Sequence, residues 1–163
     1  MSLKKLLRLA LLTAVSLILF LVEAQIPAPI PVPGVKLGLG NIIVLCVLFR
    51  CGRPEALAVL LVKVFLGAVL SGNFGAILYS LAGGLLSLGV MCLLRGMLRE
   101  KQLWVGSVVG AMFHNLGQLA AAVVISRTPA LFGYLPVLLL SGMATGLFTG
   151  IAAQAVLARL RKE

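Results

Sequence analysis

The polar side chains that could do chemistry in this chain are few, and they lie inside long apolar runs. Lys63 lies about halfway along one run, and His114, Asn115 and Gln118 lie about halfway along another. His114 and Gln118 are four residues apart, which places them on one face of a helix. Ionisable side chains at membrane depth are costly and by default mark a functional site. These groups indicate either a ligand-binding cavity or a set of polar contacts between helices.

Both interpretations are open from the residues alone. In the structural one, Lys63 pairs with Glu23 and the amide side chains bridge helices. In the other, the groups line an outward-facing cavity where Lys36, Lys63 and, as a further candidate, Arg127 meet an anionic group of a ligand. Cationic and polar groups outnumber the single nearby carboxylate, which favours the cavity. The predicted substrate-binding residues are Glu23, Gln25, Lys36, Asn41, Lys63, Asn73, Tyr79, His114, Asn115 and Gln118.

The same inventory argues against catalysis and against a bound metal. The chain has no Asp, and its four glutamates (Glu23, Glu55, Glu100 and Glu163) are far apart in sequence. Paired carboxylates that hold a Mg²⁺-diphosphate are therefore missing. The single His and the three cysteines have no zinc or redox spacing, and there is no Walker A pattern. We expect no enzyme activity, no cofactor and no metal.

The elements that position these residues are transmembrane helices. The chain has 163 residues and is 61% hydrophobic, which is more apolar surface than a soluble domain of this size can bury. A bilayer accepts apolar side chains on every outward face. The sequence therefore predicts an all-α polytopic membrane protein, a single transmembrane domain over residues 1–163 built as a six-helix bundle. The predicted spans are about 6–26, 37–49, 54–70, 74–94, 103–125 and 135–157.

Two of these spans have features of their own. The first is preceded by lysines and resembles a cleavable secretory signal peptide. Its length and the equally apolar sequence downstream favour a transmembrane span that is not cleaved. The second is short for a bilayer crossing. Between them lies the proline-rich stretch 27–34, where repeated X-Pro steps forbid a helix and predict a stiff loop.

The net charge of +10 follows from basic residues at one set of span ends. Eleven of the 14 basic residues fall at the ends that are cytoplasmic if the N-terminus is inside, which is the pattern of the positive-inside rule. We therefore expect a multi-pass protein of the cell membrane with both termini in the cytoplasm. The basic residues form no patch with interleaved aromatics, so nucleic acid is not an expected partner.

Small residues at helical spacing predict close helix contacts. The structural interpretation is packing inside the bundle. For the pair on the first span, the alternative is a docking face for another membrane protein. The small-residue sets are Ala10 with Ala14; residues 82–84 with Ser87; Gly106 with Gly110; and Gly142, Gly146 and Gly150.

Four stretches together resemble one known family: ALLTA at 10–14, VPGVKLGLGN at 32–41, YSLAGG at 79–84 and HNLGQ at 114–118. It is the bacterial Gx transporter family, also named heptaprenyl diphosphate synthase component I. That family is in turn similar to the substrate-binding (S) components of energy-coupling factor transporters. The resemblance extends from about Leu6 to about Leu157.

The resemblance implies a six-helix bundle that captures a small molecule outside the cell, beneath loops such as the one at 27–40. The expected ligand is vitamin-like or isoprenoid-precursor-like and anionic. In such S components an AxxxA motif on the first helix meets a transmembrane coupling (T) component that is driven by two cytoplasmic ATPases, and Ala10 and Ala14 match this motif. The alternative function is a non-catalytic membrane accessory subunit of prenyl diphosphate or quinone biosynthesis.

Overall fold

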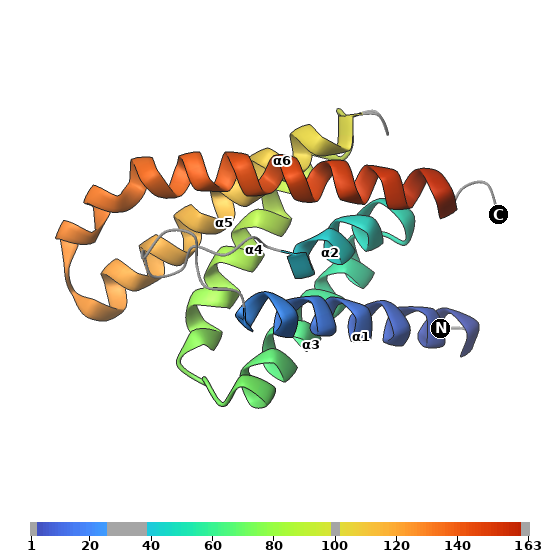
Figure 1. The fold of residues 1–163 in the computed structure, drawn as a ribbon, viewed down its shortest axis with the longest axis horizontal. Helices are drawn as coiled ribbons and strands as arrows, with labels where there is room; N and C mark the ends of the chain where they lie inside the picture. The colour runs from blue at the N-terminus through green and yellow to red at the C-terminus, as the bar shows by residue number, and fades with distance from the viewer. Residues whose placement is uncertain (1–2, 26–38, 99–101, 161–163) are drawn as a thin grey trace.

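The computed structural model describes residues 3–25, 39–98 and 102–160, and most of these residues are helical (Figure 1). Within them, five helices are long and apolar enough to cross a membrane, and one is shorter. The predicted all-α fold of a membrane bundle is confirmed. In chain order the elements are α1 (Leu3–Gln25), α2 (Leu39–Arg50), α3 (Arg53–Ser71), α4 (Ala76–Leu94), α5 (Leu103–Ser126), the 3₁₀ helix η2 (Pro129–Tyr134) and α6 (Leu135–Leu160).

The short helix α2 lies in the core of the bundle. Its residues 42–48 are all buried, and it packs against α1, α3 and α6. Twelve residues give a helix about 18 Å long, which is shorter than a hydrocarbon core of about 30 Å. A helix that is apolar all round is stable when other helices surround it. Protein rather than lipid therefore covers most of α2, and its length does not have to match the bilayer.

The close contact between α5 and α6 is made by the glycines of α6. A Cβ atom on Gly150 would lie 2.5 Å from the Cα of Trp104, and one on Gly146 would lie 2.6 Å from the Cα of Val108. Side chains larger than hydrogen at these positions would force the two backbones apart. The glycines at 83, 84, 106, 110 and 142 likewise face neighbouring segments of the chain. The packing interpretation thus accounts for the glycines of these sets in α4, α5 and α6.

Contacts made by charged side chains join several helix ends at one end of the bundle. Lys5 in α1 forms an ion pair with Glu55 in the first turn of α3. Arg95, just after α4, donates from Nη2 to the carbonyl oxygen of Phe49 near the end of α2, at 3.4 Å. The start of α1 and the end of α6 lie at the same end of the molecule in Figure 1. We call this the basic end, because the predicted cytoplasmic cations that the structure describes lie at these helix termini.

Candidate functional site

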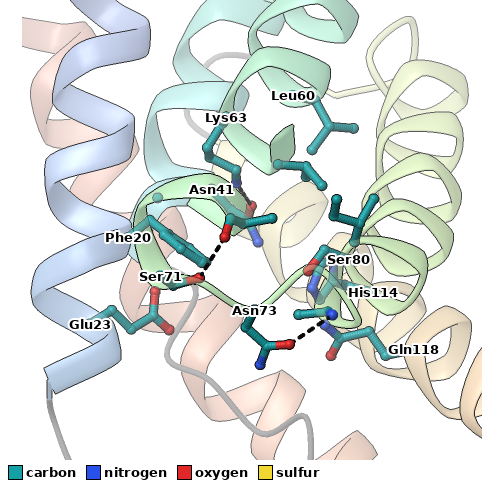
Figure 2. Close-up of a pocket in the computed structure, with 15 residues that line it drawn as sticks. Phe20, Glu23, Asn41, Leu60, Lys63, Ser71, Asn73, Ser80, His114 and Gln118 are labelled. Carbon is teal, nitrogen blue, oxygen red and sulfur yellow. Dashed lines mark hydrogen bonds between the residues drawn. The ribbon is translucent and has the colours of Figure 1, made fainter. Parts of the chain in front are cut away.

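Figure 2 shows a cavity of about 210 Å³. The helix ends that contribute to its wall place it away from the basic end. It is bounded by the last turns of α1, the middle and end of α3, the first turns of α2 and α4, and the middle of α5. The fold brings six of the ten predicted site residues to its wall: Glu23, Asn41, Lys63, Asn73, His114 and Gln118. Residues far apart in sequence thus meet in one site.

The first turn of α2 is held by polar side chains from two other helices. Glu23 Oε2 accepts a hydrogen bond from the backbone N–H of Leu39, the first residue of α2, at 3.0 Å. Lys63 Nζ, from α3, donates to Asn41 Oδ1 at 2.7 Å. Glu23 and Lys63 are only 7% and 6% exposed. A carboxylate at a helix N-terminus satisfies an orphan N–H and complements the helix dipole. Both charged groups therefore position α2 while also lining the cavity.

The opposite wall is formed by His114 and Gln118 on α5 (Figure 2). They come close to α4 because position 83 is glycine: a Cβ there would lie 2.6 Å from the carbonyl oxygen of His114 and 2.7 Å from Gln118 Cγ. Gln118 Oε1 is buried and accepts no hydrogen bond from any residue that the structure describes. A buried acceptor without a donor costs about 1–3 kcal/mol. A donor group on a ligand or a water molecule would remove that cost.

The cavity also has an apolar surface that the sequence did not single out. Phe20 lies on the same face of α1 as Glu23, three residues earlier, and its ring packs against Gly67, where a Cβ would lie 2.8 Å from Phe20 Cε1. The i, i+3 spacing from Glu23 was a usable signal for Phe20. Other lining residues that sequence reasoning missed are Gly40, Leu60, Val64, Ala68, Ser71, Ala76, Ile77 and Ser80.

Three of the other predicted site residues, Gln25, Tyr79 and Asn115, do not line the cavity. Asn115 is buried, and its Nδ2 donates to the carbonyl oxygen of Leu138 at 2.7 Å, so it joins α5 to α6. Each residue of a helix is turned by about 100° from the one before it, which directs Asn115 away from the face of His114. Lys36 lies outside the described residues.

The wall of this cavity suits binding of a compact molecule with polar and apolar parts. Lys63 and Glu23 supply one charge of each sign, and the amides of Asn41 and Gln118 supply hydrogen-bonding groups. Aliphatic side chains form much of the remaining wall. Among the residues that the structure describes, no group of three His, Cys, Asp or Glu side chains could hold a metal ion.

The chain was compared with families of known proteins. The family model for heptaprenyl diphosphate synthase component I matches residues 12–156. The chain belongs to this family. The matched region includes every residue that lines the cavity. Comparisons with curated proteins and with solved structures gave no match. The family name describes one component of a larger system, and the long apolar helices are those of a multi-pass membrane protein.

Proposed function

We propose that this chain is the substrate-binding membrane subunit, or S component, of an energy-coupling factor importer, and that it has no catalytic activity of its own. The observation that carries the proposal is the cavity lined by Lys63, His114 and Gln118 at the end opposite the basic end. By the positive-inside rule the basic end faces the cytoplasm, so the cavity faces outward. An outward cavity with polar groups on several helices is what capture of an external solute requires.

The size and lining of the cavity bear on the class of ligand. A volume of about 210 Å³ corresponds to about seven water molecules at ~30 Å³ each. A compound of one or two rings fits this space. We expect an anionic group of the ligand near Lys63, a donor group near Gln118 Oε1, and an apolar body against Phe20 and Leu60. Vitamin-like and isoprenoid-precursor-like molecules have this combination of parts.

The partner that we propose is a transmembrane coupling protein driven by two cytoplasmic ATPases, and its docking face is Ala10 with Ala14. Both alanines are exposed, on the side of α1 that faces away from the bundle. Helix α1 is the least buried of the five long helices. The glycine sets of α4, α5 and α6 are used in internal packing, whereas this pair is not. Small residues that remain on the outside permit another helix to approach closely.

The alternative is a non-catalytic accessory subunit in prenyl diphosphate or quinone biosynthesis, which the family name favours. The cavity argues against enclosure of such a product. A heptaprenyl chain has about 35 carbon atoms, whereas the cavity of about 210 Å³ holds about seven water molecules and favours a smaller ligand. The sequence also has no Asp with which to bind a Mg²⁺-diphosphate.

Native mass spectrometry of the detergent-purified chain tests the capture function. We expect a small molecule to co-purify in stoichiometric amount with the wild type and to be lost from Lys63→Met. Arg159→Gln is the matched control, because it also removes a cation but at an exposed position on α6 outside the cavity. Retention of the same molecule by Lys63→Met would refute the assigned site. A wild-type chain without any bound molecule would shift support to the accessory subunit.

Uptake by cells tests the docking face separately. We expect Ala10→Leu with Ala14→Leu to abolish uptake of the co-purifying compound while its occupancy in the purified chain is unchanged. The control is Ala58→Leu with Ala144→Leu, two exposed alanines on α3 and α6. Loss of occupancy in the α1 variant would show that the pair serves packing of the bundle instead.

A further inference from the structure

A second cavity, of about 350 Å³, lies at the basic end, far from the site described above. It is lined by Lys4, Lys5, Arg8, Leu9, Arg50 and Cys51. Four of these six residues are cations, and no carboxylate is among the described residues that line the cavity. The positive-inside rule accounts for cations on the cytoplasmic side of the membrane. It does not require that cations from two helices line the same cavity.

The electrostatics of this cavity favour an anion. Cations that share a cavity repel one another, and the repulsion is larger next to a low-dielectric bundle than in water. Lys4 and Lys5 also lie in the first turn of α1, where the helix dipole disfavours positive charge. Lys5, one of the four cations that line the cavity, forms an ion pair with Glu55 of α3. An anion bound between Arg8 and Arg50 would offset these costs.

The surface of α1 next to the cavity is apolar. Positions 4, 8, 11 and 15 follow one another along one face of the helix. Lys4 and Arg8 come first, and Leu11 and Val15, both exposed, continue the line toward the opposite end. The centre of this face is turned by about 100° from the centre of the face of Ala10 and Ala14, and Leu11 is a neighbour of Ala14 on the helix surface.

We propose that this cavity binds the phosphate headgroup of an anionic phospholipid, whose acyl chain lies along Leu11 and Val15. A phospholipid fits better than a free phosphate ion because the basic cavity and the apolar stripe are continuous on one helix. Basic pockets between helices at the cytoplasmic side of a membrane are suited to anionic headgroups. The site is independent of the solute cavity, and it does not depend on the proposed transport function.

The first test is native mass spectrometry of the full chain with equal amounts of phosphatidylglycerol and phosphatidylcholine. We expect preferential retention of phosphatidylglycerol by the wild type. Arg8→Gln with Arg50→Gln should weaken its binding about thirty-fold, from the contribution typical of one basic residue near an anionic lipid surface. Arg127→Gln with Arg159→Gln is the matched control, since both are exposed cations outside the cavity.

Cys51 provides a second measurement, because it lines the cavity and is partly exposed. In a Cys92→Ser background, we expect phosphatidylglycerol to slow alkylation of Cys51 and phosphatidylcholine not to do so. Melting curves of the purified variants show whether each one is folded.

Four results would overturn the proposal. The first is equal binding of the two lipids by the wild type, and the second is an equal loss in the control double variant. The third is displacement of phosphatidylglycerol by inorganic phosphate at millimolar concentration, which would identify a site for the free ion. A fourth result, in which the Arg8/Arg50 variant keeps its lipid but loses a co-purifying protein, would show that the cavity binds a protein partner instead of a lipid.

Discussion

Substitution of Gly83 by alanine is the sharpest test of how the cavity wall is built. The added Cβ would lie 2.6 Å from the carbonyl oxygen of His114, whereas ordinary contacts begin at 3.4 Å, so α4 and α5 must separate by about 0.8 Å along that line. The carbonyl belongs to the backbone and cannot rotate away. Overpacking of this kind costs about 1–3 kcal/mol.

Gly89 is the matched control, because it lies on the same helix and a Cβ there meets no atom within 4 Å. The gain in helix propensity from glycine to alanine, about 1 kcal/mol, is common to both substitutions and cancels in the comparison. We expect Gly83→Ala to be less stable than Gly89→Ala by about 1–3 kcal/mol. The free energy of unfolding can be measured by SDS titration in mixed micelles, followed by the fluorescence of Trp104, the only tryptophan in the sequence.

The same two variants separate stability from binding. Because Gly83 faces His114 and Gln118, we expect Gly83→Ala to lose most of any co-purifying small molecule and Gly89→Ala to keep it. Equal stability of the two variants would refute the reasoning that a glycine contact sets the distance between α4 and α5. Equal occupancy, with the stability difference present, would show that the position of α5 does not matter to the ligand.

Three further predictions use the same unfolding assay. Glu23→Ala should lower the free energy of unfolding by about 1 kcal/mol because the N–H of Leu39 loses its acceptor. Glu23→Gln should lose less, since its amide oxygen can still accept that bond. Equal stability of the wild type and both variants would show that Glu23 does not cap α2. Asn115→Ala should cost about 0.6–1.7 kcal/mol by loss of the bond to Leu138, with ligand occupancy kept, and a loss of occupancy would place this amide at the ligand. Gly150→Ala should be less stable than the control Gly89→Ala by about 1–3 kcal/mol, since its Cβ would lie 2.5 Å from the α5 backbone, and equal stability of these two variants would contradict that contact.

The helices were predictable because hydropathy and charge act along the chain. The bounds of each α-helix fall within three residues of the predicted span, whereas the 3₁₀ helix η2 was not predicted. The role of α2 was not predictable, since a run of apolar residues has the same appearance whether lipid or protein surrounds it. Its short length was the available signal, because a 12-residue helix is too short to match a bilayer by itself.

Part of the candidate site was predictable because a polar residue in the middle of an apolar span is recognisable from the sequence alone. Depth identified Lys63 and His114, and helical spacing added Gln118. Sequence position alone did not distinguish Asn115 from the cavity-lining residues, although its side chain bonds to α6 instead. It also gave no sign that Glu23 bonds to the first turn of α2, because that contact depends on how α1 and α2 pack. Lys36 lies outside the described residues, so its assignment stays a prediction.

The contrast between α1 and the other small-residue helices gives the docking proposal its physical basis. Small residues reduce the distance between helices, and the bundle uses this property wherever its own helices meet, as at Gly146 and Gly150. Ala10 and Ala14 have the same spacing but remain exposed on the least buried long helix. Lipid chains gain nothing specific from such a surface, whereas a partner helix does. A coupling protein that contacted this face would leave the cavity wall formed by α3, α4 and α5 undisturbed, so docking and capture can vary independently.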